Sequence, residues 1–286
     1  MRALVTGAKG LIGSHMAQFL EDRLYEVKRV DIEQDLRVWS NAYDVTKGID
    51  EVYHFAADVG GIGYLKDPKN KQRLMENTLI NWNVLKAASL NKVKRIFLAS
   101  SSCVYTDNHN EDETYPADCE NMYGWEKLHL EHMAQAFPEI NPRIGRFQNI
   151  YGPNCHWNDG RDMALPALCR KVLEAEKEIE VWGDGLQMRN WLYVGDCVKA
   201  VYELTQSDYD QPLNIGSDQS VSISELAKTV IGISGKDIKI KYVSGPEGQK
   251  FKFCNNRLRN EVLKWRPSVS LDEGIRQTYE WIRSQL

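Results

Sequence analysis

The sequence lacks the residue patterns of several protein classes. Its six cysteines form no C-x-x-C pair and have no H-x₃₋₅-H partner, so neither a zinc site nor a disulfide framework is predicted. No apolar run approaches the roughly 18 residues that a membrane-spanning helix needs, and the N-terminus has no signal-peptide pattern. Lys and Arg (36) do not outnumber Asp and Glu (40), which argues against a nucleic-acid-binding protein, although a local basic patch stays open. We therefore expect a soluble, cytoplasmic protein with free thiols, no bound metal, and neither nucleic acid nor membrane as a partner.

The composition and periodicity predict an α/β fold. Apolar residues make up 42% and charged residues 27%, which excludes collagen-like, low-complexity and wholly disordered chains. A length of 286 residues predicts one main domain and a smaller lobe. Short apolar runs at 2–6, 26–31, 51–56, 95–100 and 142–146 alternate with amphipathic segments, which is typical of a parallel sheet. The expected helices lie at 11–21, 70–88, 122–136, 165–176, 194–205 and 223–231, and a short strand is expected at 213–215. S-x-x-E capping boxes at 222/225 and 270/273 are expected to begin two late helices.

The first expected strand runs directly into a G-x-x-G-x-x-G loop at residues 7–13. Gly7 allows a tight turn, Gly10 lets the backbone approach a pyrophosphate, and Gly13 lets helix and strand pack closely. Asp31 ends the next strand, where a carboxylate suits the ribose hydroxyls of adenosine. Such glycines also occur in ordinary turns, and Asp31 alone would fit a strand-end turn. Together, the loop and Asp31 predict a Rossmann-type, doubly wound sheet with a dinucleotide site.

We expect residues 1–162 to form this dinucleotide-binding domain, with some later segments returning to it. Residues 163–286 are expected to form a smaller, interleaved substrate-binding lobe. Because Asp31 would repel a 2′-phosphate and no Arg or Lys follows it immediately, NAD is predicted rather than NADP. The predicted cofactor-binding residues are Gly7, Gly10, Leu11, Ile12, Gly13, Asp31, Asp35, Leu36, Ala56, Tyr123 and Lys127.

A second group of chemically active residues follows the later strands. The run 100–103 (SSSC) ends one strand, and Tyr123 and Lys127 lie four apart on one face of the next helix. We expect the Lys127 cation, helped by a positive nicotinamide, to lower the pKa of Tyr123 from about 10 toward working pH. Tyr123 would then act as the base for a substrate hydroxyl while hydride leaves to the cofactor. A Y-x-x-x-K pair alone usually marks a solvated helix face, but here it accompanies the glycine loop and the serine run.

Longer motifs make the prediction more specific. They are residues 56–63 (AADVGGIG), 101–105 (SSCVY), 143–153 (RIGRFQNIYGP), 182–187 (WGDGLQ) and 245–248 (GPEG). With these motifs the chain resembles, over essentially its whole length, the extended short-chain dehydrogenase/reductase family of nucleotide-sugar epimerases and dehydratases, and within it the GDP-mannose 3,5-epimerases. The resemblance implies an NAD-dependent epimerase of a GDP-hexose that works through a transient 4-keto intermediate. It also implies a homodimer paired through helices such as 70–88 and 122–136, whose patterns fit sheet-packing faces equally well.

The resemblance assigns roles to particular residues. Tyr123 would oxidise the sugar at C4, Ser101 would hydrogen-bond the same oxygen, and Cys103 would remove a proton from C3 or C5 next to the ketone. Position alone leaves Cys103 equally readable as a small buried residue. Dehydratases of the family carry an acidic residue there, so a dehydratase is not expected. The implied substrate-binding residues are Gly61, Ser101, Cys103, Asn149, Met163, Lys171, Gln187, Arg189 and Lys252.

Two positions depart from the family pattern. Lys252 stands where the family has an arginine that clamps the diphosphate, so the clamp is weaker or supplemented, or Lys252 is a solvated surface lysine. Met163 stands where the 3,5-epimerases have a lysine that returns the proton, and methionine cannot do so. His156 in the same loop is a candidate substitute, although lone loop histidines are more often merely exposed.

Two other functions stay open. A simple 4-epimerase needs Tyr123 and Lys127 but no acid at position 163. A dinucleotide sensor without turnover typically loses the Tyr or the Lys of this pair, and both are present here.

Overall fold

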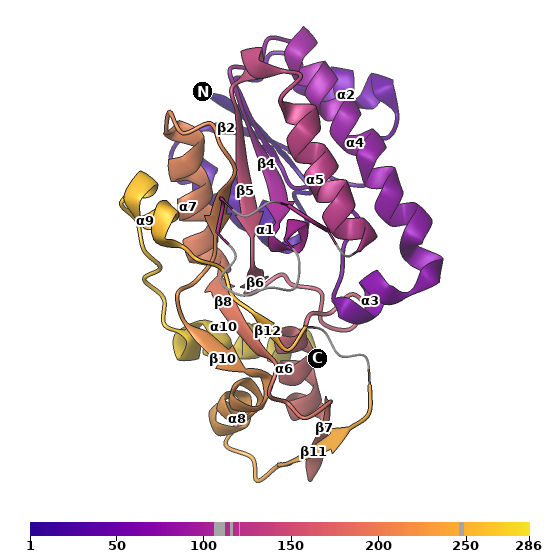
Figure 1. Ribbon diagram of the computed structural model, residues 1–286, viewed down its shortest axis with the longest axis vertical. Coiled ribbons are helices and arrows are strands. Elements are labelled where there is room, and N and C mark those ends of the chain that lie inside the picture. The colour runs from indigo at the N-terminus through magenta and orange to yellow at the C-terminus, as the bar shows by residue number, and fades with distance from the viewer. Residues whose placement is uncertain (106–111, 115–116, 120, 246–248) are drawn as a thin grey trace.

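The larger lobe is built on a six-stranded parallel sheet of order β2-β1-β3-β4-β5-β9 (Figure 1). The structure is a computed structural model that describes residues 1–105, 112–114, 117–119, 121–245 and 249–286. The strands are β1 (Arg2–Thr6), β2 (Glu26–Val30), β3 (Glu51–His54), β4 (Arg95–Ser101), β5 (Pro142–Phe147) and β9 (Leu213–Ile215). The chain leaves β1 for β2 on one side and returns to β3 on the other, so the strand order reverses between β1 and β3. Ligands of open parallel sheets bind at such a reversal, beyond the carboxyl ends of the strands.

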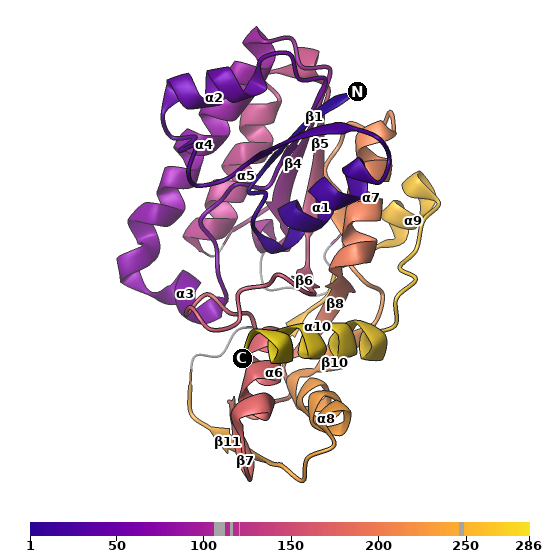
Figure 2. The ribbon, with the colours of Figure 1, turned by 180° about the vertical axis from the view of Figure 1, so that it is seen from behind.

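Helices cover both faces of this sheet, which confirms the predicted doubly wound fold (Figure 2). In β1, Ala3 and Val5 pack into one core and Leu4 into the other, and all three are fully buried. Burial on both faces explains why this strand is apolar at successive positions. One face carries α1 (Leu11–Glu21) and α7 (Val194–Gln206), and the other carries α2 (Trp39–Thr46), α4 (Lys71–Leu90) and α5 (Met122–Ala134).

The smaller lobe has its own core between short strands and three helices. Its strands are β6 (Asn149–Tyr151), β7 (Glu178–Trp182), β8 (Met188–Tyr193), β10 (Ser220–Ser222), β11 (Lys239–Val243) and β12 (Phe251–Lys252). Its helices are α6 (Ala164–Glu174), α8 (Ile223–Ser234) and α10 (Leu271–Gln285), while α9 (Arg257–Leu263) packs beside β9 and α7. The chain enters this lobe at β6 and returns to the large sheet through α7 and β9, as expected for interleaved lobes. The division at residues 162 and 163 stays a prediction.

The six helices predicted with bounds are present, and each end lies within three residues of the prediction. Helices α2, α9 and α3 (Ile62–Lys66) were not predicted. The predicted box at the start of α8 is present: the Ser222 hydroxyl accepts a hydrogen bond from the backbone of Glu225, whose carboxylate accepts one from the Ser222 backbone. At α10 only half of the predicted box is present: the Ser270 hydroxyl accepts the backbone N–H of Glu273 at 3.3 Å, while the Glu273 carboxylate accepts from Gln277 instead. In the described part of the chain, no helix is long and apolar enough to span a bilayer.

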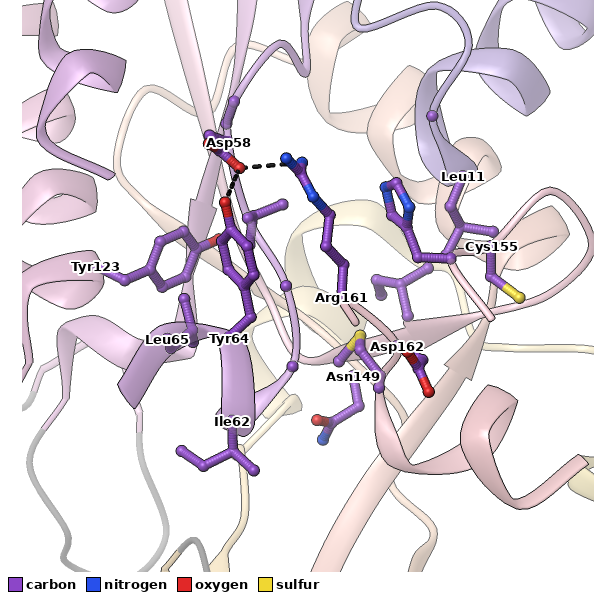
Figure 3. A pocket seen from close by; sticks show the side chains of 18 of the residues that line it. Leu11, Asp58, Ile62, Tyr64, Leu65, Tyr123, Asn149, Cys155, Arg161 and Asp162 are labelled. Atoms are coloured by element: carbon purple, nitrogen blue, oxygen red, sulfur yellow. Dashed lines mark hydrogen bonds and ion pairs between the residues drawn. The ribbon is translucent and has the colours of Figure 1, made fainter. Parts of the chain in front are cut away.

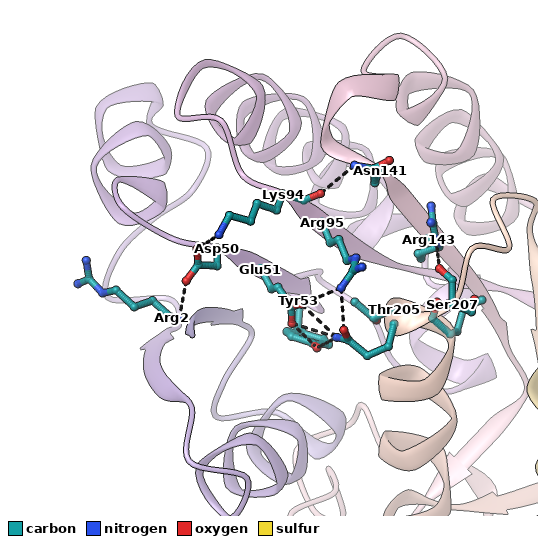
Figure 4. A network of polar contacts seen from close by, with 12 residues as sticks. Arg2, Asp50, Glu51, Tyr53, Lys94, Arg95, Asn141, Arg143, Thr205 and Ser207 are labelled. Atoms are coloured by element: carbon teal, nitrogen blue, oxygen red, sulfur yellow. Dashed lines mark hydrogen bonds and ion pairs between the residues drawn. The ribbon is translucent and has the colours of Figure 1, made fainter.

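A polar cluster closes the amino-terminal edge of the large sheet (Figure 4). The buried carboxylate of Glu51 accepts hydrogen bonds from the Tyr53 hydroxyl at 2.9 Å and from the Gln206 amide at 3.1 Å. Arg95 donates to Gln206 at 2.7 Å and lies 3.5 Å from Glu51. These contacts tie β3, β4 and α7 together at the edge opposite the carboxyl ends of the strands.

Candidate active site

A pocket of about 2160 Å³ lies between the two lobes at the carboxyl ends of β1, β3 and β4. It is at least twice the size of a pocket for one drug-sized ligand, so it has room for a dinucleotide and a second ligand. Every cofactor-binding, catalytic and substrate-binding residue predicted from the sequence lines this pocket. Their individual roles stay predictions. Of the motif at 245–248, residues 246–248 lie outside the described residues.

The glycine loop has the geometry that its spacing predicts. Gly7 has a φ of +66°, and a Cβ there would come within 2.9 Å of the backbone at Phe55 and Ala56. A Cβ on Gly13 would come within 2.1 Å of the Gly7 carbonyl oxygen. Gly10 begins α1 without a side-chain cap, so the first N–H groups of the helix stay available to an anion. The loop therefore fits the pyrophosphate of a dinucleotide.

Two acidic residues that follow β2, Asp31 and Asp35, line the pocket, and Asp31 lies beside the glycine loop. Asp31 accepts hydrogen bonds from the backbone N–H groups of Lys9 at 2.7 Å and Ile32 at 2.9 Å. Asp35 is bound by the Arg37 guanidinium, whose hydrogen bonds hold the pKa of this carboxyl below its usual 3.8. Arg37 also pairs with Glu76. Because two carboxylates compensate Arg37, it is poorly placed to attract a 2′-phosphate, which favours NAD.

Ser101, Cys103 and Tyr123 converge at the end of β4. Ser101 accepts the backbone N–H of Cys103 at 3.1 Å and also hydrogen-bonds Tyr123. Asn121 caps α5 through the N–H of Gly124 at 2.9 Å. A Cβ on Gly124 would lie 2.1 Å from the Cys103 carbonyl oxygen, so only glycine lets α5 pack this closely against η2 (Ser102–Val104). This close packing brings the phenol and the thiol to the same corner of the pocket.

In the protein without NAD, the pKa of Tyr123 is raised rather than lowered. The expected lowering by Lys127 together with a positive nicotinamide stays a prediction for the complex. Burial, followed by the charges of Cys103 and Glu126, raises the pKa of Tyr123 well above 10, and the hydrogen bond from Ser101 offsets only part of this. The Lys127 ammonium lies 5.5 Å from the centroid of the Tyr123 ring but pairs with Glu126 at 3.3 Å. Helix spacing predicts the proximity of Tyr123 and Lys127 but not the ion pair between Lys127 and Glu126.

The predicted substrate residues line the part of the pocket formed with the smaller lobe. Gly61 touches the loop before α6: its N–H bonds the Arg161 carbonyl at 2.9 Å, and a Cβ there would lie 3.3 Å from the Cα of Met163. Lys171 donates to the Glu180 carbonyl at 2.7 Å. Asn149 donates to the Asn190 carbonyl at 2.9 Å.

Lys252 is paired in register with Arg189 across β12 and β8. Both residues line the pocket, and Lys252 is half-buried rather than fully solvated. Paired residues of neighbouring strands lie on the same face, so the two side chains begin side by side, and the Arg189 guanidinium donates to the carbonyls of Met188 and Gln249. This arrangement favours the interpretation in which Arg189 supplements the Lys252 point charge at a diphosphate.

His156 forms a pair with Asp159 in the loop that precedes Met163. Its Nδ1 lies 2.5 Å from a carboxylate oxygen of Asp159, and both side chains are about half exposed. Of the two, His156 lines the pocket. Among the described residues, no group of three or more His, Cys, Asp or Glu side chains is arranged to hold a metal ion.

Sequence reasoning missed an ionic link across the pocket (Figure 3). The Asp58 carboxylate accepts a hydrogen bond from the Tyr64 hydroxyl at 2.8 Å and pairs with Arg161 at 3.0 Å. The Asn77 side chain accepts the backbone N–H of Asp58 and donates to its backbone carbonyl. The link joins the loop after β3 to the loop before α6. Asp58 lies in a recognised motif, but nothing in the sequence pairs it with Arg161.

Comparisons with known proteins agree with this site. The model of the NAD dependent epimerase/dehydratase family matches residues 3–216. GDP-mannose 3,5-epimerase 1 of Oryza sativa subsp. japonica is 37% identical over 313 residues, which cover 100% of this chain and 82% of that relative. The GDP-mannose 3,5-epimerase of Arabidopsis thaliana is 37% identical over 314 residues, covering 100% and 83%.

A solved structure extends the agreement to the cofactor. UDP-glucuronic acid 4-epimerase from Bacillus cereus, in complex with UDP-glucuronic acid and NAD, has a TM-score of 0.89, 25% identity and full coverage of both chains. The glycine loop and the Asp31 region of the present chain fit a dinucleotide, and the predicted cofactor, NAD, is confirmed. The protein is a member of the NAD dependent epimerase/dehydratase family.

Proposed function

We propose that this protein is an NAD-dependent nucleotide-sugar epimerase that acts on a GDP-hexose through a transient ketone at C4. The observation that carries the proposal is the convergence of Ser101, Cys103 and Tyr123 in the same pocket as the glycine loop. The 37% identity to GDP-mannose 3,5-epimerases over the whole chain supports the choice of sugar and base.

The proposed reaction begins at the C4 hydroxyl. Bound at the glycine loop and the Asp31 region, NAD would supply the hydride acceptor and donor for C4. Tyr123 takes the hydroxyl proton, assisted by the Lys127 cation, while Ser101 hydrogen-bonds the sugar oxygen. The ketone acidifies the hydrogens on C3 and C5, and the Cys103 thiolate removes one of them. After inversion, the Tyr123 hydroxyl gives its proton back to the C4 oxygen.

Inversion at C3 or C5 also requires an acid on the opposite face of the sugar. Met163 cannot serve, and we propose the His156–Asp159 pair of the same loop as the replacement. Asp159 holds Nδ1 and leaves Nε2 of the imidazole free for proton transfer. The presence of Met163 is also the specific observation that favours the second candidate, a 4-epimerase in which no C–H proton is exchanged.

We propose that the two lobes bind different ligands. Residues 1–162 would hold the cofactor, while residues of the later half, with Gly61 and Asn149, would hold the nucleotide sugar. Arg189 and Lys252 would take the diphosphate charge. Gln187 and Lys171 would contact the nucleotide sugar from the smaller lobe.

We infer a homodimer that pairs through α4 and α5. Met75, Leu79 and Trp82 recur along one side of α4 and are exposed, as is Trp125 on α5. Such a stripe suits a partner surface.

The proposed cytoplasmic location rests on the six cysteines, all of which are free thiols, as a reducing compartment requires.

The proposed function is tested by turnover of GDP-mannose in D₂O with NAD present, followed by NMR of the product. Deuterium at C3 or C5 that disappears in Cys103→Ala supports the proposal. Cys119→Ser is the matched control, because Cys119 is buried near Cys103 but does not line the pocket. A 4-epimer with no deuterium at carbon would identify the 4-epimerase, and absence of turnover on any nucleotide sugar would refute the proposal.

A further inference from the structure

A chain of buried polar side chains runs behind the Tyr–Lys pair, from the end of β1 to α5. Thr6 Oγ1 lies 2.7 Å from His54 Nδ1, His54 Nε2 lies 3.0 Å from Asn81 Oδ1, and Asn81 Nδ2 lies 2.6 Å from Glu126 Oε1. The other oxygen of Glu126 faces the Lys127 ammonium at 3.3 Å. All five residues are at most 3% exposed. Of these residues, only Lys127 lines the pocket.

The direction of each hydrogen bond in this chain follows from its first member. Thr6 Oγ1 accepts the backbone N–H groups of Phe55 and Ala56 at 3.2 Å each, so its hydroxyl proton is left to donate to His54 Nδ1. His54 must then carry its proton on Nε2 and donate to the Asn81 oxygen. The Asn81 amide group in turn donates to Glu126. Each side chain of the series therefore donates to the next one, and the last of them, the Glu126 carboxylate, only accepts.

Helix geometry alone does not produce the contact between Glu126 and Lys127. Neighbouring residues on a helix point in different directions and do not face each other. Here Asn81 of α4 binds one oxygen of Glu126 and leaves the other directed at Lys127. A buried ammonium without a partner is costly, and Glu126 compensates its charge.

The charges around this pair come from several elements. Glu126 and Lys127 lie on α5, Cys103 follows β4, and His54 comes from β3. Burial first, then Cys103 and Glu126, raise the pKa of Tyr123. Burial lowers the pKa of His54 to about 4, and the Lys127 cation contributes to this, so His54 stays neutral. This series of hydrogen-bonded side chains is thus electrostatically coupled to both Tyr123 and Lys127.

We propose that Glu126, held by Asn81, His54 and Thr6, is a positioning residue that shares the Lys127 cation with Tyr123 and so sets the pH at which Tyr123 works. Its role in turnover rests on the proposed function, whereas the ion pair and the hydrogen-bond directions do not. Glu126→Gln keeps the shape and the Asn81 contact but removes the competing charge. The phenolate of Tyr123 then becomes the main counter-ion of Lys127.

The first experiment measures the pH dependence of kcat/KM. In Glu126→Gln the acid limb should move to lower pH by about one unit or more, the size typical of a nearby charge. Glu131→Gln is the matched control: Glu131 is a buried glutamate of the same helix, but it pairs with Arg146 and not with Lys127. An acid limb that is unchanged or moves upward in Glu126→Gln, or moves equally in both variants, would overturn the proposal.

The second experiment needs no substrate and stands even if the proposed reaction is wrong. Urea unfolding is compared for Glu126→Gln, Lys127→Met and the double variant. Each single change leaves one buried group without its partner, so each should lower the urea midpoint, and the double variant should recover part of the loss. Additive losses would show that the two side chains do not interact and would overturn the ion pair.

The third experiment tests the direction of the chain by ¹⁵N NMR of the histidine rings, with His54 assigned through His54→Gln. The expected spectrum shows neutral His54 protonated on Nε2, with no titration from about pH 5.5 upward. A proton on Nδ1, or a titration near the ordinary value, would overturn the assigned hydrogen-bond chain. This measurement also shows whether a variant that lost turnover is still folded around His54.

Discussion

The carboxylate of Asp31 accepts a hydrogen bond from the backbone N–H of Lys9 at 2.7 Å. This contact joins the end of β2 to the glycine loop and fixes the carboxylate beside the turn at Gly7. The second oxygen of Asp31 accepts the N–H of Ile32, so the group is held from two sides. A carboxylate has further lone pairs, and these remain for ribose hydroxyls.

Asp31→Asn is expected to relax the preference for NAD over NADP. The amide keeps a hydrogen-bond acceptor for the Lys9 N–H but removes the charge that repels a 2′-phosphate. A loss of about tenfold in the preference is expected from one such repulsion near a protein surface. Fluorescence titration with both cofactors measures it, and Asp31→Ala should also weaken NAD because the loop loses its anchor. Wild-type protein that binds NADP as tightly as NAD would contradict this prediction.

Tyr123→Phe is expected to abolish turnover while NAD binding stays within a few-fold of the parent. Only the phenolic oxygen is removed, and a general base contributes about 10²–10⁴-fold to the rate. Tyr105→Phe is the control, because Tyr105 hydrogen-bonds Arg146 and Asn214 in the core and does not line the pocket. Turnover by Tyr123→Phe at the parental rate would rule out the proposed oxidation at C4.

His156→Ala is expected to slow deuterium incorporation at C3 or C5 by about 10²-fold or more, because the returning proton loses its donor. Asp159→Asn should have a smaller effect, since it removes only the partner of Nδ1. Adding Met163→Lys to His156→Ala should restore part of the rate, because a lysine at this position would supply the acid that the family resemblance implies there. If His156→Ala exchanges deuterium as fast as the parent, the second acid is not His156.

Stability is expected to rise with pH between about 4 and 6.5 because of His54. Its pKa falls from 6.5 to about 4 on folding, chiefly through burial. In this window the unfolded chain binds a proton that the folded chain does not, so acid favours unfolding, by about 3 kcal/mol in total. Urea midpoints measured from pH 4.5 to 7.5 should show this slope in the parent and in His132→Gln, an exposed control on α5, but a reduced slope in His54→Gln. Equal slopes in parent and His54→Gln would contradict the assignment.

Short-range patterns were sufficient for much of the fold and the site. The turn at Gly7, the close packing at Gly13 and the shared helix face of Tyr123 and Lys127 each depend on a few neighbouring residues, and all were predicted correctly. Strands β1 and β4 were located because burial on both faces makes them nearly continuous apolar runs. The short strands of the smaller lobe carry no such run and were not predicted. Since parallel strands end at one edge, the residues that follow them were expected to meet, and they line one pocket.

The charge state of the site was decided by tertiary structure alone. Helix spacing shows that Lys127 is near Tyr123, but the pKa of Tyr123 depends on burial and on Glu126, whose orientation is set by Asn81 from another helix. The pairing of Asp58 with Arg161 likewise joins two loops that are distant in the sequence. Desolvation and charge pairing depend on which groups pack together in space. Contacts between different elements cannot be predicted from the spacing of residues along one element.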